Sequence, residues 1–558
     1  MKHPSLPLLA LLAAIPAPAL AQDILLEGIV VSANLSAVEG DRTGNKVDVV
    51  TEDDLKTAGN LKLADYLSRL PGLSFGQSGP TGTTGDLKIR GAGGEYISVY
   101  VDGILVTDPT GTESQFDDFG GLTTLGVRRV EVLRGSQSAL YGGTAVAGVV
   151  NIETMPGDDA PEGISQTVSV EAGSFDTAML AYSLVQRQGR LLLSFGASHA
   201  QSSGFSAADD DAPGDDNSEA DGFERSRLSL GARYELTENL SIGANLFVET
   251  GESDFDEALF ENGSSRPIDG TPDEVAERDA QAARIYGTYV GELFTHEFGA
   301  SVYRIERSLA SPTTLPGGYP YASEFDGRRQ MLDYVATGQL SDQWRLSLGA
   351  DLKDETATYS NVAQGSQSVI TRGIFGETIY SPTPDLDITG TARLDDHSRF
   401  GSEVTGRLTF AWRPTEADVV RGAIANGYRA PSLDELYGDY PDAFFSGNPD
   451  LEPETSRAIE RGYDHSFSGG AQISATLFRM EIDNAIVLAN DFSTIENRPG
   501  QSRRQGVELG GFLPLSEKTS LTAAYTYVDA REANGDRVPR VPRDQLVLGL
   551  ETQLTEAL

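Results

Sequence analysis

The sequence contains no cysteine, so it can form neither disulfide bridges nor thiolate metal sites. Basic residues are also few: 43 Lys and Arg stand against 83 Asp and Glu, which gives a formal net charge of -40. Phosphate binding requires clustered Lys and Arg, so this balance argues strongly against nucleic acid as a partner. After position 21 no run of about 18 to 20 apolar residues occurs, which excludes an ordinary helical membrane protein. A transmembrane β-barrel is not excluded, because its strands alternate apolar and polar residues and so have a low average hydropathy.

Catalytic motifs are missing as well. The chain has no G-x-S-x-G, no H-E-x-x-H and no phosphate-binding loop. A hydrolase of the outer membrane would need a nucleophile, a base and an orienting group, and the sequence shows no such set. We therefore predict that the protein is not an enzyme and requires no cofactor.

The first 21 residues have the composition of a secretory signal peptide. Residues 1–3 are a short positive start, residues 6–20 are apolar, and Ala-Leu-Ala at 19–21 is a cleavage site before Gln22. This segment predicts export from a bacterial-type cell.

From residue 160 to residue 558 the sequence alternates between apolar and polar residues. Clear examples are residues 227–236, 240–248, 386–394 and 404–412. Strands of about ten residues with one apolar face have the length needed to cross a membrane at a tilt. A soluble β-sandwich is the alternative, but the polar face is too polar for a core and the strands exceed the usual length of about five to six residues.

The connections between these segments differ in length. Residues 237–239 form a tight turn, whereas residues 202–222 and 250–278 form long acidic loops. Alternation of short turns and long loops is typical of an outer-membrane barrel. The predicted fold class is therefore all-β dominated, with an antiparallel transmembrane β-barrel over residues 160–558.

Residues 47–155 have the pattern of a small α+β domain. Thr51, followed by acids at 52–54, caps a helix start. The stretch 127–154 closes the domain with two short strands joined through glycines, which permit positive φ or close backbone approach. Residues 61–70 have helical spacing that ends at Pro71-Gly72, and further strands are indicated at residues 47–50, 87–91 and 96–101.

A tail and two loops complete this part of the chain. Residues 23–33 contain a β-branched run, which can form the first strand of the domain or add as an edge strand to a partner's sheet. Residues 34–46 are polar, and we expect them to be mobile. The loops at 76–86 and 107–121 are long and rich in glycine, and long loops on a small scaffold often carry binding.

Assembled, these parts resemble a TonB-dependent outer-membrane receptor. Residues 27–33, Glu-Gly-Ile-Val-Val-Ser-Ala, are similar to a TonB box. Segments similar to the family's plug domain are DYLSRLPG (65–72), IRG (89–91), YVDG (100–103) and the stretch 127–154. Segments similar to its barrel are YRAP (428–431), NPDLEPE (448–454), RRQGVE (503–508), YTYVDAR (525–531) and VPRVPR (538–543).

The resemblance implies a 22-stranded barrel in the outer membrane of a Gram-negative bacterium, monomeric, with the plug of residues 47–155 inside the lumen. It also implies TonB-driven uptake of a scarce large nutrient. TonB, energised by ExbB and ExbD, would pair with residues 22–46 through the TonB box. An extended β-branched segment suits such pairing, which needs main-chain hydrogen bonds more than specific chemistry. The predicted TonB box comprises Glu27, Gly28, Ile29, Val30, Val31, Ser32 and Ala33.

Among subfamilies the chain is most similar to the vitamin B12 (cobalamin) receptors. The similarity lies in Asp-Gly-Phe at 221–223 after an acidic loop and in Leu-Asp-Glu-Leu-Tyr at 433–437. Ferric siderophore and haem receptors share most of the motifs and remain alternatives. Haem receptors typically place a histidine between the two barrel motifs, and residues 429–447 contain none. A passive porin-like channel is the alternative of a different class, and it leaves residues 22–155 without a role.

The resemblance also implies a set of binding residues. Arg90 and Arg134 are expected to pair with acids on the inner wall and to dock the plug. Acidic residues of one loop are predicted to bind Ca²⁺, which takes six to eight oxygens, with a solvated loop as the alternative: Asp209, Asp211, Asp215, Asp216 and Asp221. The predicted substrate contacts are Gln77, Ser78, Thr81, Thr83, Thr84, Thr107, Asp108, Thr110, Thr112, Ser114 and Phe116.

The end of the chain departs from the family pattern. About 400 barrel residues at roughly 20 to 22 per strand and loop give about 18 strands, fewer than the family's 22. The last residues, 553–558, lack the family's terminal aromatic strand. Open edges are not tolerated in lipid. We therefore expect a fragment, or a gene truncated near its end.

Overall fold

The computed structural model describes most of the chain. The described residues are 29–30, 32–59, 62–111, 123–124, 126–157, 160–206, 220–261, 264–268, 274–311, 321–360, 365–440, 445–489 and 493–554.

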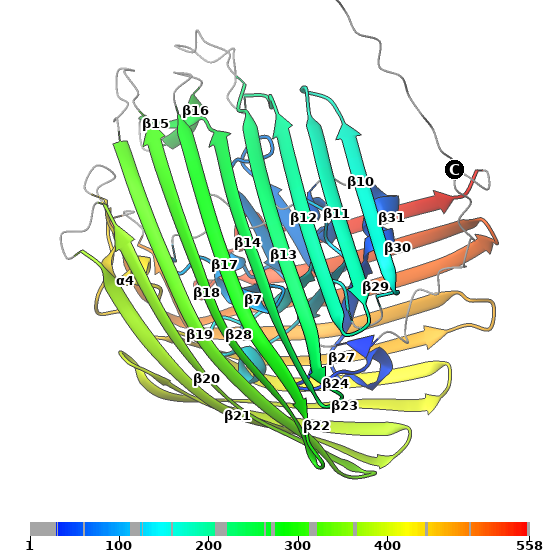
Figure 1. Ribbon diagram of the computed structural model, residues 1–558. Coiled ribbons are helices and arrows are strands. Elements are labelled where there is room, and N and C mark those ends of the chain that lie inside the picture. The colour runs from blue at the N-terminus through cyan, green and yellow to red at the C-terminus, as the bar shows by residue number, and fades with distance from the viewer. Residues whose placement is uncertain are drawn as a thin grey trace, which may run out of the picture.

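One antiparallel sheet of 18 strands dominates the structure and curves around a smaller domain (Figure 1). Neighbours in the sheet are almost all neighbours in sequence, as in an up-and-down barrel. The first nine strands are β10 (Gly163–Ala172), β11 (Ala178–Gln188), β12 (Leu191–Ser202), β13 (Phe223–Thr237), β14 (Leu240–Asp254), β17 (Val275–Val290), β18 (Phe294–Ser311), β19 (Tyr321–Ser341) and β20 (Trp344–Tyr359). The others are β21 (Gln367–Thr383), β22 (Leu386–His397), β23 (Gly401–Thr415), β24 (Asp418–Arg429), β27 (Glu454–Ser466), β28 (Gln472–Leu488), β29 (Ile495–Ser516), β30 (Thr519–Arg531) and β31 (Asp544–Thr552).

The period-2 pattern places one set of side chains outside and the other inside. In β13, Leu228 and Leu230 are exposed large hydrophobics, and their cross-strand partners on β14, Val248 and Leu246, are exposed too. In an aqueous protein such faces would be a liability, whereas a lipid-facing wall requires them. Aromatic side chains gather near the short turns, where Trp344 of β20 stacks on Tyr380 with ring centroids 4.3 Å apart.

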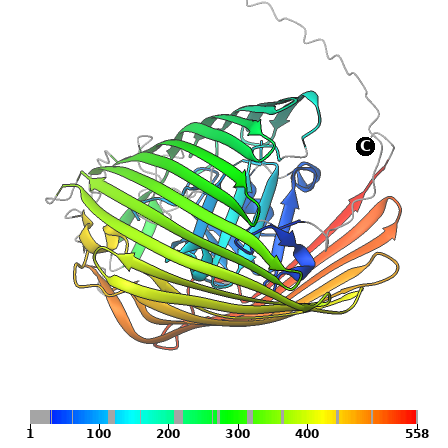
Figure 2. The ribbon, with the colours of Figure 1, turned by 60° about the horizontal axis from the view of Figure 1, so that its bottom comes forward.

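The predicted barrel strands and their number are confirmed. The segments 227–236, 240–248, 386–394 and 404–412 lie inside longer strands, and the sheet has 18 members. Within the part of the chain that the structure describes, β10 and β31 form no ladder with each other, and Figure 2 shows the sheet as an open trough.

Short and long connections alternate between the two ends of the sheet. Residues 238–239, 342–343 and 416–417 are short turns at one end, and the segment 430–453 is a long connection at the other. In outer-membrane barrels the short turns face the periplasm and the long loops face the exterior.

The smaller domain lies inside the trough (Figure 2). Its five-stranded sheet has the order β3-β8-β9-β6-β7, and a β4–β5 hairpin packs beside it. Leu63, Ile89, Val130 and Ile152 belong to its core and are almost fully buried. The strands are β3 (Val47–Thr51), β4 (Leu73–Gln77), β5 (Gly85–Ile89), β6 (Ile97–Val101), β7 (Ile104–Leu105), β8 (Arg129–Arg134) and β9 (Gly148–Glu153).

Short helices and small strand pairs complete the structure. Thr51 caps α1 with a reciprocal capping box to Asp54, as its sequence predicts. The helical turn predicted over 61–70 is only five residues long, because Pro71-Gly72 leads directly into β4. These elements are α1 (Glu52–Ala58), α2 (Leu63–Leu67), α3 (Ser138–Tyr141), α4 (Leu433–Tyr437), η1 (Gly40–Arg42), η2 (Gly94–Tyr96), β1 (Ile29–Val30), β2 (Val38–Glu39), β15 (Glu257–Glu261), β16 (Ser264–Ile268), β25 (Asp439–Tyr440) and β26 (Phe445–Ser446).

The stretch 127–154 forms the centre of the small domain. β8 and β9 pair along their whole length, and β9 also pairs in parallel with β6. At Gly148 a Cβ would lie 2.4 Å from the Leu133 carbonyl oxygen and 2.7 Å from Ile89 Cδ1, so only glycine fits this close approach. Among the described residues, no helix combines the length and apolar character needed to cross a membrane.

Candidate functional site

Arg90 fastens the middle of the plug to the barrel wall. Its Nε donates to Glu508 Oε1 at 2.7 Å, its Nη2 to Glu508 Oε2 at 3.0 Å, and its Nη1 to Glu460 Oε2 at 2.7 Å. The guanidinium also lies over the ring of Phe478, 4.5 Å from its centroid. Burial alone would lower the pKa of Arg90, but the attraction of Glu508 and Glu460 outweighs it and holds the pKa above its ordinary value. The buried charge is thus fully paired, which is the condition for tolerating it.

The backbone around Arg90 aims its side chain at the wall. Arg90 adopts φ 55° and Gly91 φ 78°, so two successive residues are left-handed. Such a conformation in a non-glycine residue costs of the order of 1 kcal/mol and persists only where the surroundings fix it. Here the Arg90 amide donates to the Gly72 carbonyl at 2.6 Å.

Arg134, in the stretch 127–154, reaches the same carboxylate from another strand. Its Nη1 donates to Glu508 Oε2 at 3.2 Å and to the Pro71 carbonyl, and its Nη2 donates to Asp48. Both arginines thus converge on Glu508, so the buried carboxylate faces two cations.

A second charged cluster joins the plug to the long connection between β24 and β27. Arg429 donates to both carboxylate oxygens of Glu435 at 3.0 and 2.9 Å and also to Glu454. The Tyr96 hydroxyl of the plug donates to Glu454 at 2.9 Å. Glu435 closes a capping box with Ser432 at the start of α4, so the same carboxylate both begins the helix and holds Arg429.

The plug loop at 107–111 is held against the barrel wall near the long loops. Arg307 of β18 pairs with Asp108 at 2.8 Å and donates to Thr110 Oγ1 at 3.0 Å. Tyr359 donates to the Thr110 carbonyl at 2.5 Å, and Arg329 donates to the Thr107 carbonyl at 2.7 Å. Thr110 has no exposed surface. The predicted substrate contacts Thr107, Asp108 and Thr110 therefore already bind the protein's own groups, whereas Thr112, Ser114 and Phe116 lie outside the described residues.

The other predicted substrate loop is tied mostly to itself. Gln77 Nε2 donates to the Pro80 carbonyl at 2.6 Å, and the Thr83 hydroxyl donates to the same carbonyl at 2.8 Å. The Ser78 amide donates to the Thr84 carbonyl at 2.8 Å, which closes the loop. Ser78 is exposed, Thr81 is partly exposed and Thr83 is buried. Their assignment to substrate stays a prediction.

The predicted calcium site is described only in part. Asp209, Asp211, Asp215 and Asp216 lie outside the described residues, and Asp221 is buried two residues before β13 begins. In the part of the chain that the structure covers, no three His, Cys, Asp or Glu side chains gather in a way that could hold a metal ion.

The predicted TonB box lies folded into the lumen. Its described members are Ile29, Val30, Ser32 and Ala33, and β1 pairs with β2 as a small antiparallel ladder. Val30 is 1% exposed and packs in the apolar cluster that contains Leu133 and Val149. Glu27, Gly28 and Val31 lie outside the described residues.

Polar side chains of the plug and the barrel hold this segment in place. The Ser32 amide donates to Glu131 Oε2 at 2.9 Å, its hydroxyl donates to the same oxygen, and its carbonyl accepts from the Tyr141 hydroxyl at 2.8 Å. The Ala33 carbonyl accepts from Arg407 Nη2 at 2.8 Å. In this state the amide and carbonyl of Ser32 and the carbonyl of Ala33 are occupied by internal partners.

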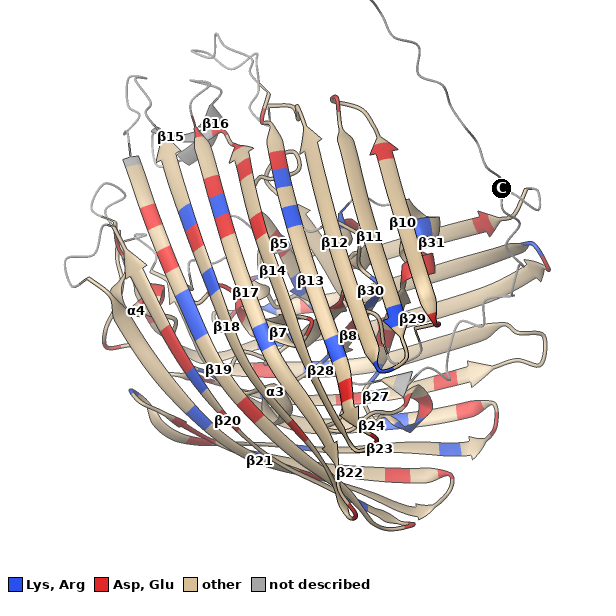
Figure 3. Ribbon diagram, viewed as in Figure 1, with Lys and Arg blue, Asp and Glu red and all other residues tan. Residues whose placement is uncertain are grey.

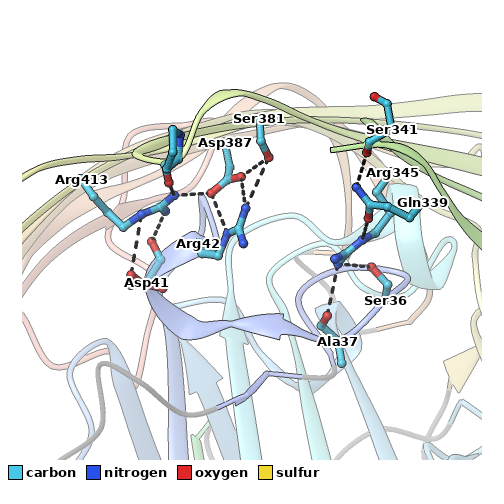
Figure 4. A network of polar contacts seen from close by, with 11 residues as sticks. Ser36, Ala37, Asp41, Arg42, Gln339, Ser341, Arg345, Ser381, Asp387 and Arg413 are labelled. Carbon is cyan, nitrogen blue, oxygen red and sulfur yellow. Dashed lines mark hydrogen bonds and ion pairs between the residues drawn. The ribbon is translucent and has the colours of Figure 1, made fainter. Parts of the chain in front are cut away.

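The segment predicted to be mobile, residues 34–46, lies against the short turns of the barrel (Figure 4). Arg42 donates to Asp387 through Nε at 3.0 Å and through Nη2 at 2.8 Å. Arg413 donates to the same carboxylate at 2.6 Å and to the Asp41 carbonyl at 3.1 Å. Arg345 donates to Ser36 and to the Ala37 carbonyl, each at 3.4 Å. We call the Arg42, Asp387 and Arg413 side chains the basal ion cluster.

Sequence reasoning missed the residues that hold the TonB box. The available signal for Glu131 was a single acid within an otherwise apolar strand, Val130-Glu131-Val132. The signal for Arg407 and Asp387 was their place in the inward-facing set of barrel strands, where a charge must find a partner. Neither signal identifies the partner, because the partners are separated by 99 to 374 residues of sequence.

Known proteins share both parts of this architecture. A model of the TonB-dependent receptor-like β-barrel matches residues 172–555, and a model of the TonB-dependent receptor plug domain matches residues 40–149. The vitamin B12 transporter BtuB of Photobacterium profundum is 25% identical over 509 residues, which cover 88% of this chain and 76% of that protein.

Solved structures show the same fold at lower identity. The siderophore receptor PirA from Acinetobacter baumannii matches with a TM-score of 0.75 and 18% identity, over 92% of this chain and 84% of that one. The ferripyoverdine receptor of the outer membrane of Pseudomonas aeruginosa matches with a TM-score of 0.77 and 14% identity, over 95% and 76%. With a barrel model that spans more than half of the chain and a plug model in front of it, this protein belongs to the family of TonB-dependent outer-membrane receptors.

Proposed function

We propose that this receptor takes up a scarce large nutrient by gated active transport, with residues 27–33 as the contact for TonB. The observation that carries the proposal is the double restraint of Ser32, whose amide and carbonyl are both occupied inside the lumen. A segment held in this way can pair with a partner strand only after release, which makes its exposure a controllable step. The family consists of receptors and transporters, not enzymes, and this role fits it.

Deletion of residues 27–33 tests the proposal. We expect uptake of substrate to cease while binding at the cell surface remains, because the deleted residues lie far from the long loops. A receptor reconstituted in liposomes that admits substrate without TonB would instead support a passive channel. We infer that ExbB and ExbD supply the energy through TonB and that the receptor acts as a monomer, which native mass spectrometry in detergent can check.

For the substrate we propose cobalamin, with a ferric siderophore as the alternative. The similarity to a vitamin B12 transporter over 88% of the chain supports cobalamin. The fold similarity to siderophore receptors supports the alternative. Titration of the purified receptor with cyanocobalamin and, separately, with ferric siderophores decides between them: nanomolar binding of one and none of the other assigns the class.

We propose that substrate contacts come from the plug loops at 76–86 and 107–121, with Ca²⁺ at the acidic loop that ends at Asp221. Hydroxyl and amide groups suit a neutral polar ligand such as a corrinoid. Asp221 lies two residues before β13 begins at Phe223, directly after this loop in the sequence, which supports the choice of its carboxylate. Calorimetry with Ca²⁺ on the intact receptor tests the metal site, and the absence of a heat of binding would refute it.

A further inference from the structure

Arginines that are buried in this structure are almost always held by an acid. Apart from one, each buried arginine of the described residues has a carboxylate oxygen within 3.5 Å: Arg90, Arg134, Arg278, Arg307, Arg329, Arg393, Arg407, Arg421 and Arg429. Figure 3 shows how closely the two signs are mixed, because acidic and basic bands stand next to each other along β17 and β18. A buried charge is tolerated where it is paired, so this arrangement is the expected one.

Arg504 on β29 is the exception. It is 5% exposed, and its Nε and Nη1 atoms have no hydrogen-bond partner. Among the residues that the structure covers, no carboxylate lies within ion-pair distance of its guanidinium. The guanidinium lies 6.0 Å from the centroid of the Tyr96 ring, which Arg429 also approaches to 5.4 Å. An aromatic face attracts a cation but carries no charge of opposite sign, so the positive charge of Arg504 is left unbalanced.

The neighbouring strands supply no acid at this point. Alternation along β29 gives Arg504 the same direction as Glu508, which binds the plug, so its side chain faces the lumen. Directly opposite Arg504 lie Met480 of β28 and Ala530 of β30, both of them buried. The wall beside the guanidinium is therefore apolar, and a charge gains little from such surroundings.

The acids that bind the adjacent parts of the plug already have other partners. Glu508 holds the two plug arginines described above. Glu454, which accepts the hydroxyl of Tyr96, holds Arg429. Moving either carboxylate to Arg504 would leave another buried arginine without its partner, so neither of them can balance it.

The guanidinium stands on the side of the plug where substrate arrives. β29 begins at the long-loop end and ends at a short turn, so Arg504 lies nearer the long loops than Glu508. Two residues before Tyr96, Gly94 is exposed, and a Cβ atom there would meet no atom within 4 Å. Open space therefore borders the plug turn beside Arg504, and an anionic group of a ligand can enter it.

We propose that Arg504 binds an anionic oxygen group of the substrate, a phosphate diester or a carboxylate, at the junction of the plug and β29. This contact rests on the proposed function, because it belongs to the same transport site. A guanidinium presents its N–H donors in a planar fork that matches the oxygens of both groups. Cobalamin carries a single phosphate diester on its nucleotide arm, and this group would supply the charge that Arg504 lacks.

The experiment measures the binding of two corrinoids to the purified full-length receptor by calorimetry. Cyanocobalamin carries the phosphate diester, whereas dicyanocobinamide has the same ring without the nucleotide arm. Arg504→Gln should weaken the binding of cyanocobalamin about 10- to 100-fold, because a hydrogen bond to a charged group is lost, and should leave that of dicyanocobinamide within about twofold. Arg504→Lys keeps the charge and should restore most of the affinity for cyanocobalamin.

Two controls separate a substrate contact from a structural role. Arg503→Gln changes the neighbouring residue, whose side chain is 39% exposed on the opposite face, and should leave both affinities unchanged. Without ligand, Arg504→Gln and Arg504→Met should unfold at the temperature of the wild type or above it, because they remove a buried charge that has no partner. Arg393→Gln should unfold at a lower temperature, since it leaves Asp351 and Asp395 without their arginine.

The results distinguish this contact from the transport role itself. Equal loss of both corrinoids, no loss of either, or a lower unfolding temperature of both ligand-free Arg504 variants overturns the contact and leaves the proposed function standing. If Arg504→Gln loses only a stabilisation by inorganic phosphate, measured against chloride at equal ionic strength, the site holds a free anion and the substrate contact is refuted.

A wild type that binds neither corrinoid refutes cobalamin as the substrate. The same comparison then uses ferric enterobactin, which is anionic, and ferrichrome, which is neutral. Selective loss of the anionic ligand in Arg504→Gln would support the contact, and a receptor that binds none of the four ligands overturns it.

Discussion

Replacing Arg42 with Gln removes the bidentate contact of the basal ion cluster without leaving a buried charge alone. Asp387 is 1% exposed, but it keeps Arg413 at 2.6 Å and the Ser381 hydroxyl at 2.5 Å. The barrel should therefore fold normally. What changes is the attachment of residues 34–46 to the short turns, and through them the attachment of the TonB box.

The magnitude follows from the geometry and from solvent exposure. Hydrogen bonds to a charged group contribute about 1.5–3 kcal/mol. The Arg42 side chain is 36% exposed, so solvent screening reduces this contribution, and we estimate about 1–2 kcal/mol. The released population of the segment should then rise by roughly 5- to 30-fold.

The absence of cysteine makes the assay direct, because one introduced thiol can be labelled alone. Ala37 is exposed beside the cluster, so Ala37→Cys can carry a spin label. The mobile component of the electron paramagnetic resonance spectrum should grow by the factor above in Arg42→Gln. The affinity for a soluble TonB fragment should rise with it, because apparent affinity scales with the competent fraction.

Arg187→Gln is the matched control, since Arg187 pairs with Glu235 at 3.6 Å near a short turn and is not part of the basal ion cluster. Its spectrum should equal that of the parent protein. A mobile fraction that stays the same in Arg42→Gln and in the control would refute the idea that the basal ion cluster restrains the TonB box.

Three further changes test other parts of the structure. Among the described residues, Arg90→Ala leaves the buried Glu460 with the Asn45 amide as its one remaining donor, so plug docking should weaken by about 3–5 kcal/mol, seen as faster proteolysis of the plug in the intact receptor. Gly148→Val drives a side chain into the Leu133 carbonyl and should cost at least about 1–3 kcal/mol by calorimetry, whereas Gly94→Ala, with no atom within 4 Å of its Cβ, should change little. Burial raises the pKa of Asp434 to about 7, although the Tyr440 hydroxyl bond opposes this. Because the pKa of Asp434 is higher in the folded than in the unfolded state, the docking of α4 should be most stable below about pH 4 and should weaken as the pH rises through 7. Hydrogen exchange can follow this change, and Asp434→Asn should remove the pH dependence.

The sequence predicted the barrel well because its signal is local. The alternation of apolar and polar residues in 227–236 and 404–412 indicates which face of the strand contacts lipid. It can be recognised locally, because successive side chains of a strand point to opposite faces. The helix expected over 61–70 is shorter than its apolar spacing indicates, because the chain turns into β4 at Pro71.

The site was harder to predict because its contacts are long-range. Arg90 and Glu508 are separated by 418 residues, and Arg42 and Asp387 by 345. No local pattern specifies which inward acid of which strand receives a given arginine. Residues 34–46 are an example: their polarity indicated mobility, yet their side chains have partners near three short turns of the barrel.

The plug is held at three levels that differ in exposure. Near the long loops, Arg307 and Asp108 are 2% and 14% exposed, and in the middle Arg90 and Glu508 are 6% and 3% exposed. At the base Arg42 is 36% exposed, so water weakens this level most. A force applied at residues 27–33 would act on the contacts of Ser32 and Ala33 and then on the base, which is the most exposed of the three levels. These exposures predict that the basal ion cluster yields before both the Arg90 contacts and the loop at 107–111.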